Sequence, residues 1–227
     1  MIRCHKKTLS NGLRLVTVEM PHLHSAEIAV YLKVGGRSDP AAKAGLSHFL
    51  EHMLFRGTTE YPSNLDLENA FELIGGSVNA ATDEESTCYF SRVHPRHVGD
   101  GIRLLASMLL RPTLPGIEVE KRIITEEALE DFNERGEEIN TNNLASRLLW
   151  PGHPLGVPTI GYLDTIASFG GDDLRRHLAE FYSPANAVVV ATGNVHADSV
   201  FTAAEEAFGA WVGPPSPAVL TPSTGQC

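Results

Sequence analysis

The order of strand-type and helix-type segments is the feature that most constrains the fold of this chain. Some segments are rich in β-branched and aromatic residues and end at turn residues, whereas others repeat apolar residues every three to four positions. Strands are expected within 8–19, after the turn signal Asn11-Gly12, and at 26–34, 77–82, 87–93 and 187–192. Helices are expected at 41–55, 64–74, 96–110, 117–135, 140–150, 163–168, 172–182 and 197–208. This order predicts an α+β fold with a mostly antiparallel sheet and helices packed on one face.

The length of 227 residues fits one large domain or two small ones, and 42% hydrophobic residues are enough to build a core. The last fifteen residues, GPPSPAVLTPSTGQC, are rich in Pro, Ser and Thr, which is typical of a tail or linker. We therefore expect one domain over residues 1–212, followed by a tail over 213–227. Because no apolar run approaches the length that crosses a bilayer, no membrane association is expected.

The charge and the cysteines bear on partners and location. The formal net charge is −10, and there is no block of basic residues. Since nucleic-acid affinity comes mostly from neutralising phosphates, we expect no nucleic-acid partner. The sequence has three cysteines, Cys4, Cys88 and Cys227. None of them form a Cys-x-x-Cys pair, and any single disulfide would leave one cysteine unpaired. Free thiols in a reducing compartment are the simplest account, so we expect a cytoplasmic location.

The segment His48-Phe49-Leu50-Glu51-His52 carries the strongest chemical signal. On a helix, one apolar arc is formed by Leu46, Phe49, Leu50, Met53 and Leu54. His48, Glu51 and His52 fall on the opposite face, with the imidazoles one turn apart, at a separation that suits one Zn²⁺. Glu51 can then act as general base on a water at the open position of the zinc. On pattern alone, the same face could simply be solvated.

A catalytic zinc site needs a third protein ligand, because two histidines leave the ion under-coordinated. Glu120 and Glu127 are seven residues apart and lie on nearly the same helical stripe, whereas Glu126 points about 100° away. Glu127 could bind the metal while Glu120 holds a ligand or a water from behind. Considered alone, an acidic helix of this kind is more often a solvated surface.

The chain resembles the pitrilysin and mitochondrial-processing-peptidase family of inverzincin metallopeptidases over nearly its whole length, as the first domain of an N-terminal half. The resemblance lies in 9–16 (LSNGLRLV), 45–58 (GLSHFLEHMLFRGT), 75–82 (GGSVNAAT), 120–127, 153–156 (HPLG) and 181–186 (FYSPAN). It implies His48, His52 and Glu127 as zinc ligands, Glu51 as general base and Glu120 as supporting carboxylate. The implied activity is that of a zinc endopeptidase acting on peptides or small flexible protein segments.

The resemblance also implies that residues 77–82 form an edge strand near the metal, on which an extended peptide substrate lies. In such strand addition, main-chain hydrogen bonds hold the peptide while alternate side chains enter pockets. The expected substrate contacts are Asn79, Ala80, Thr82 and Phe55. From local chemistry, Asn79 is equally well a turn or bulge residue, and Phe55 is equally well a packed aromatic.

Members of this family typically contain two similar halves that enclose the substrate, and the other half supplies an arginine and a tyrosine. Only one such domain is present in this sequence. We therefore expect a homodimer, a second half-subunit as partner, or a fragment of a longer protein. The alternative functions are a non-catalytic peptide-binding or assembly subunit, which commonly has a degraded metal motif, and a structural zinc module, which would need a fourth protein ligand.

Overall fold

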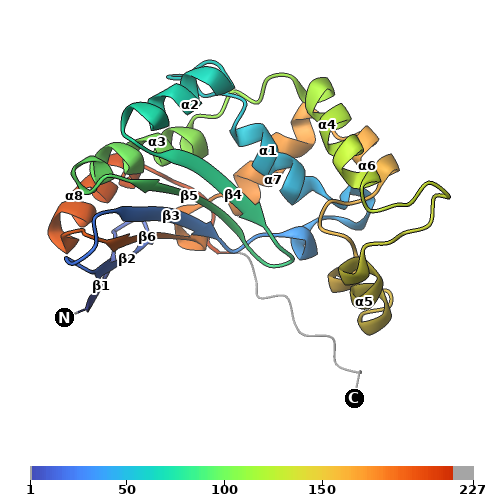
Figure 1. Cartoon of the computed structure of the whole chain (residues 1–227), viewed down its shortest axis with the longest axis horizontal. Helices are drawn as coiled ribbons and strands as arrows, with labels where there is room; N and C mark the ends of the chain where they lie inside the picture. The colour runs from blue at the N-terminus through green and yellow to red at the C-terminus, as the bar shows by residue number, and fades with distance from the viewer. Residues whose placement is uncertain (1, 217–227) are drawn as a thin grey trace.

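The computed structural model describes residues 2–216 of the chain, and its sheet contains six strands. The strands are β1 (Arg3–Thr8), β2 (Arg14–Glu19), β3 (Ala26–Leu32), β4 (Ser77–Thr82), β5 (Thr87–Val93) and β6 (Ala187–Gly193). Their spatial order is β1-β2-β6-β3-β5-β4, so β1 and β4 are the edges (Figure 1). The pairing of β2 with β6 is parallel and the other four pairings are antiparallel. The expected α+β fold with a mostly antiparallel sheet is confirmed.

The helices lie on one side of the sheet, with α5 standing apart beyond its far end (Figure 1). They are α1 (Leu46–Leu54), α2 (Asn64–Leu73), α3 (Val98–Leu110), α4 (Ile117–Leu129), α5 (Thr141–Leu149), α6 (Leu163–Ser168), α7 (Gly171–Phe181) and α8 (Ala197–Phe208). Short 3₁₀ turns are η1 (Gly36–Ser38), η2 (Ala41–Lys43), η3 (Pro95–His97), η4 (Pro154–Gly156) and η5 (Pro184–Asn186). Helices α3 and α8 contact the sheet, and α1 contacts β4, α4 and α7.

The core lies between the helices and one face of the sheet. On β3, alternate residues Ile28, Val30 and Leu32 are fully buried toward the helices, while Tyr31 between them is 46% exposed. This is the period-two pattern of a strand with one covered face. On α1, the side chains of the apolar arc expected from the sequence are all buried. Because the arc faces the core, the opposite face of α1 is left to carry polar side chains.

One strand was missed, and the ends of two expected helices differ from the structure. Strand β1 was not expected, because five of its six residues are exposed and it therefore lacks an alternating apolar pattern. The expected helix 41–55 is wrong in its first five residues, since the continuous helix starts at Leu46. Gly45 has a φ of 93°, and a Cβ there would lie 2.3 Å from the carbonyl oxygen of Ile160. The chain turns sharply at this glycine before α1 begins.

The expected helix 117–135 is also too long, because α4 ends at Leu129. Beyond it, Phe132 and Glu138 form an isolated bridge, and the side-chain oxygen of Asn133 accepts hydrogen bonds from the backbone N–H groups of Arg135 and Glu137. Such side-chain bonds to the backbone compete with helix continuation.

Toward the C-terminus, residues 213–216 contain no helix or strand, and residues 217–227 lie outside the described residues, so the predicted tail over 213–227 stays a prediction. In the described part of the chain, no helix has the length and apolar character needed to cross a membrane.

Candidate metal centre

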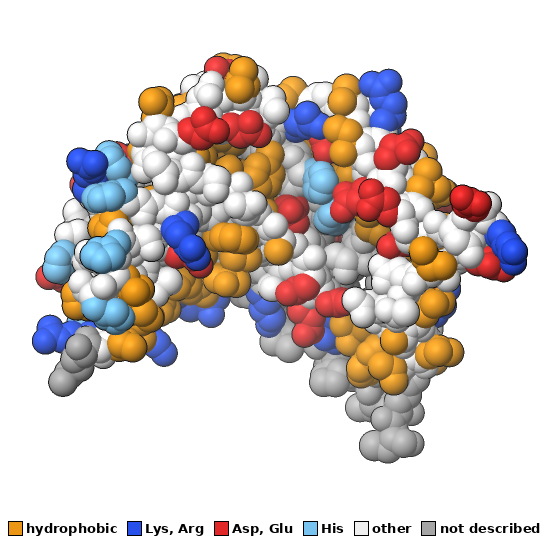
Figure 2. Space-filling view, in the orientation of Figure 1, with side chains coloured by type: hydrophobic (Ala, Val, Ile, Leu, Met, Phe, Trp, Pro, Cys, Tyr) orange, Lys and Arg blue, Asp and Glu red, His pale blue; other side chains and the backbone are white. Residues whose placement is uncertain are grey.

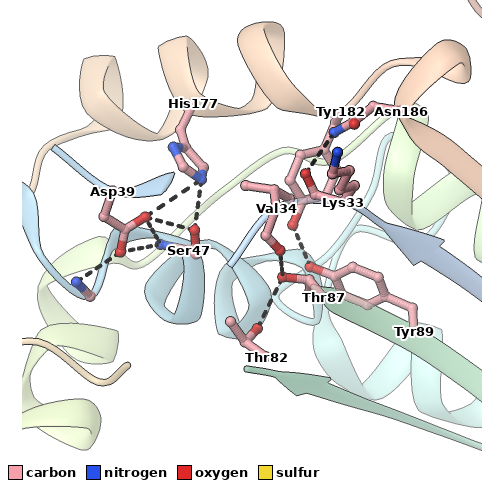
Figure 3. Close-up of polar contacts among 11 residues, drawn as sticks. Lys33, Val34, Asp39, Ser47, Thr82, Thr87, Tyr89, His177, Tyr182 and Asn186 are labelled. Carbon is pink, nitrogen blue, oxygen red and sulfur yellow. Dashed lines mark hydrogen bonds and ion pairs between the residues drawn. The ribbon is translucent and has the colours of Figure 1, made fainter. Parts of the chain in front are cut away.

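The first turn of α1 is held by a buried polar cluster from three segments. The carboxylate of Asp39 accepts hydrogen bonds from the backbone N–H groups of Gly45, at 2.9 Å, and Ser47, at 3.1 Å. It also accepts the Ser47 hydroxyl proton at 2.6 Å, and Nε2 of His177 on α7 lies 3.0 Å from the same hydroxyl oxygen (Figure 3). Asp39 thus satisfies N–H groups that every helix start leaves without a partner. The position of the turn that carries His48 is therefore set by this cluster.

The protonation of this cluster follows from its burial. Desolvation raises the pKa of Asp39 to about 7 and lowers the pKa of His177 to about 4. When Asp39 is ionised, the Ser47 hydroxyl proton goes to Asp39, so the Nε2 atom of His177 donates to the Ser47 oxygen. His177 is neutral at pH 7 because burial lowers its pKa, and in this state its proton is on Nε2.

The structure brings His48, His52 and Glu127 together. Each offers one atom that could hold a metal ion, and these atoms lie within 4.8 Å of one another. The carboxylate oxygens of Glu127 lie 3.7 Å from Nε2 of His48 and 3.6 Å from Nε2 of His52. Zinc–ligand bonds of about 2.0–2.1 Å in tetrahedral geometry place neighbouring ligand atoms about 3.3 Å apart. The two distances from the Glu127 carboxylate to the imidazoles are close to that value.

The chemistry of these three side chains also suits Zn²⁺. Burial lowers the pKa of His48 to about 4, so this imidazole is neutral and keeps a lone pair for a metal. Its Nδ1 atom is buried with no hydrogen-bond partner among the described residues. Burial raises the pKa of Glu127. Two imidazole nitrogens and one carboxylate oxygen form a ligand set that zinc commonly takes in catalytic sites, with a position left open.

Glu120 holds the ring nitrogen of His52 that does not face Glu127. Its side chain is 3% exposed, and Oε1 lies 3.0 Å from Nδ1 of His52, while Oε2 is bonded to the Nε of Arg56. Burial alone would raise the pKa of Glu120, but the bonds from His52 and Arg56 outweigh it and lower that pKa. Burial alone would lower the pKa of His52, but Glu120 and the nearby carboxylates raise it. With Nδ1 held by Glu120, the Nε2 atom of His52 is directed toward Glu127.

Glu51 lies on the same face of α1 and is 8% exposed. Burial raises the pKa of its carboxyl group. The hydroxyl of Thr82, the last residue of β4, donates to Oε2 of Glu51 at 2.5 Å. Thr82, expected from the sequence as a substrate contact, is therefore bonded to the expected base.

The other expected substrate residues lie along β4 and beside α1. Asn79 is exposed and Ala80 is partly buried on β4, which among the described strands pairs only with β5. Its outer edge therefore presents unpaired backbone groups. The centroids of the Phe55 and Tyr89 rings lie 6.4 Å apart, so Phe55 packs against another aromatic ring. Phe55 also lines a groove of about 320 Å³ together with Glu51, His52, Arg56, Asn64, Glu68 and Glu120.

The site opens on the surface between α1 and α4, where Figure 2 shows histidine and acidic side chains side by side in a hollow. Sequence reasoning missed Arg56 and the cluster formed by Asp39, Ser47 and His177. Arg56 lies four positions after His52, so its helical spacing was a usable signal. No local signal linked Asp39 to His177, because 138 positions separate them in the sequence.

The fold and this site are consistent with a metallopeptidase domain. The family description "Insulinase (Peptidase family M16)" matches residues 14–161, and the description "Peptidase M16 inactive domain" matches residues 168–226. The chain belongs to peptidase family M16, which confirms the resemblance inferred from its motifs.

Curated relatives and solved structures agree with this assignment. An uncharacterized zinc protease of Bacillus subtilis is 35% identical over 206 residues, covering 90% of this chain and 49% of the relative. The beta subunit of the mitochondrial-processing peptidase of Blastocladiella emersonii is 33% identical over 203 residues, covering 88% of this chain and 43% of the relative. The crystal structure of a protease from Helicobacter pylori superposes with a TM-score of 0.85 at 25% identity, covering 98% of this chain and 54% of that one. The chain spans about half the length of the curated relatives it matches.

Proposed function

We propose that this chain provides the zinc-binding half of an endopeptidase that hydrolyses peptides or small flexible protein segments. The observation that carries the proposal is the convergence of His48, His52 and Glu127 from two helices, with buried Glu51 on the same face. The names of the relatives as zinc proteases support it. When bound, Zn²⁺ would polarise the scissile carbonyl group and make a water molecule more acidic.

The side chain of Glu51 carries the proton in this proposal. As the water oxygen bonds to the carbonyl carbon, the carboxylate of Glu51 accepts one water proton. When the C–N bond breaks, Glu51 returns that proton to the leaving amine nitrogen, so the base is regenerated. The raised pKa of Glu51 suits both steps, because a carboxyl group of ordinary acidity is a weaker base near neutral pH.

Strand β4 is the proposed binding surface for the peptide. Its free edge can add an extended segment through main-chain hydrogen bonds, which selects for flexible chains more than for a particular sequence. Asn79 and Ala80 are the proposed contacts on this strand. The groove beside Phe55 is the proposed pocket for one side chain next to the scissile bond.

The proposal includes a second protein surface that covers the open side of the site. The centre lies in an open hollow of the surface, and the curated relatives are about twice as long as this chain. We propose that a second half-subunit, a second copy of this chain, or a further part of a longer protein covers the site. A cytoplasmic location is also proposed, and the free thiols of Cys4 and Cys88 support it.

The test compares the parent chain with Glu51→Gln and Glu127→Ala, with Glu126→Gln as the control, because Glu126 is an exposed neighbour on α4. Zinc content and cleavage of an unstructured fluorogenic peptide are measured, alone and with a candidate partner. Glu51→Gln should keep zinc and lose cleavage by at least about 100-fold, Glu127→Ala should lose zinc, and the control should match the parent. Cleavage by Glu51→Gln at the parental rate would contradict the role of Glu51. Peptide binding by a zinc-free parent without cleavage would instead favour the non-catalytic subunit.

A further inference from the structure

The hydrogen bond between Thr82 and Glu51 joins the proposed base to the proposed substrate strand. We propose that Thr82 is a positioning residue: its hydroxyl holds Oε2 of Glu51 at the end of β4 and thereby fixes the base relative to a peptide on that strand. This inference rests on the proposed function, in which Glu51 is the base. It changes the expected role of Thr82 from substrate contact to support of the base.

The direction of this hydrogen bond follows from counting protons. A carboxylate can only accept, so the Thr82 hydroxyl must donate to Glu51. The hydroxyl oxygen of Thr87 lies 3.3 Å from that of Thr82, directly opposite it in the pairing of β4 with β5. Thr87 donates its own proton to the carbonyl oxygen of Val34 at 2.8 Å (Figure 3). Thr87 therefore has no proton left for Thr82, and the Thr82 proton is available to Glu51.

Burial limits the other hydrogen-bond partners that the Glu51 carboxylate could use. Glu51 is 8% exposed and Thr87 is fully buried, so water has little access to the strand side of the carboxylate. Tyr89 and Tyr182 are also buried, and their hydroxyl groups bond to each other at 2.9 Å. Among the described residues, Thr82 is the side chain that forms a hydrogen bond with Glu51. A buried carboxylate that lost this partner would turn toward solvent or bind a proton.

The two oxygens of Glu51 thus have different environments. Oε2 is held by Thr82, whereas Oε1 has no hydrogen bond to another described residue and can meet a water. Since catalysis by a base depends on its position relative to the reacting atoms, removing the hydroxyl should slow turnover more than it weakens peptide binding. A side chain that contacted substrate directly would instead change KM.

The first experiment needs no enzymatic activity. In the NMR spectrum of the zinc-loaded chain, the Thr82 hydroxyl proton should exchange slowly with solvent in the parent and at least about ten times faster in Glu51→Ala. Equal exchange rates in the two proteins would overturn the inference. This measurement does not depend on peptide cleavage. If the chain cleaves no peptide, the proposed function fails, but the exchange rates still show whether Thr82 donates to Glu51.

The second experiment measures kcat, KM and zinc content for Thr82→Val, which removes the hydroxyl at nearly constant shape, and for Thr82→Ser, which keeps it. Thr202→Val on α8 is the matched control, because this threonine is exposed on another element. Thr82→Val should lower kcat by about 10- to 100-fold with KM within about two-fold and zinc retained, and Thr82→Ser should restore kcat to within about three-fold. An unchanged kcat, a change confined to KM, or loss of zinc in Thr82→Val would overturn the inference.

Discussion

Replacing Asp39 by asparagine removes a buried charge at the start of α1 while nearly keeping the shape of the side chain. With its amide oxygen in the place of Oδ2, asparagine can still accept from the backbone N–H groups of Gly45, at 2.9 Å, and Ser47, at 3.3 Å. Its NH₂ group would face the Ser47 hydroxyl, which can then donate to Nε2 of His177. The substitution therefore changes mainly the electrostatics of the cluster, and its effect should depend on pH.

The magnitude follows from the raised pKa of Asp39, which is about 7 in the folded chain against an ordinary value of 3.8. Between these values the folded state binds a proton that the unfolded state has released. Asp39 therefore adds stability below pH 3.8, and this contribution is lost as the pH rises through 7. At about 1.4 kcal/mol per pH unit, the loss is about 4 kcal/mol. Asparagine does not titrate, so the variant should gain about 4 kcal/mol relative to the parent between about pH 4 and pH 8.

Urea unfolding followed by circular dichroism, on zinc-free protein at several pH values, measures this difference. The lowered pKa of His177 makes the stability of the parent rise with pH, opposite to the effect of Asp39, so the two proteins are compared at each pH value. Asp172→Asn is the control, because the Asp172 side chain is 87% exposed. A difference between parent and Asp39→Asn that changes by less than about 1 kcal/mol, or that falls with pH, would refute the conclusion that burial raises the pKa of Asp39.

Two further variants test the contact of α4 with His52 and the packing of α1. Glu120→Gln removes the charge that holds Nδ1 of His52, so zinc affinity measured by competition with a chelator should fall about 10- to 100-fold, and an unchanged affinity would contradict the supporting role. Phe49→Ala removes a fully buried ring that packs edge-to-face on Phe169 at 5.1 Å, so the free energy of unfolding should fall by about 3–5 kcal/mol. A loss below about 1 kcal/mol in urea unfolding would show that this contact contributes little.

Segments with a clear period were predictable from the sequence. The alternation in β3 and the apolar arc of α1 follow directly from the spacing of apolar residues, because side chains alternate on a strand and advance 100° per residue on a helix. Strand β1 lacked such a pattern because it is an exposed edge strand. The start of α1 was missed because it depends on a close approach between Gly45 and Ile160, which are distant in the sequence.

The candidate site was also predictable from local patterns only in part. Helical spacing alone placed His48, Glu51 and His52 on one face, and placed Glu120 and Glu127 on one stripe. Whether that stripe was a solvated surface or part of a metal site depended on the packing of α1 against α4. Arg56 pairs with Glu120, and Thr82 pairs with Glu51. Each pair joins two segments that are distant in the sequence, so local patterns did not predict it.

The sequence by itself determined the periodic elements, the family and the chemical types available for a metal centre, because these depend on neighbouring residues along the chain. Only the tertiary structure decided which hydroxyl holds Glu51 and which carboxylate holds the start of α1, and it brought Glu127, already implied by the family resemblance, to the two imidazoles. Those contacts depend on how distant segments pack in the core, and that packing is a property of the whole chain.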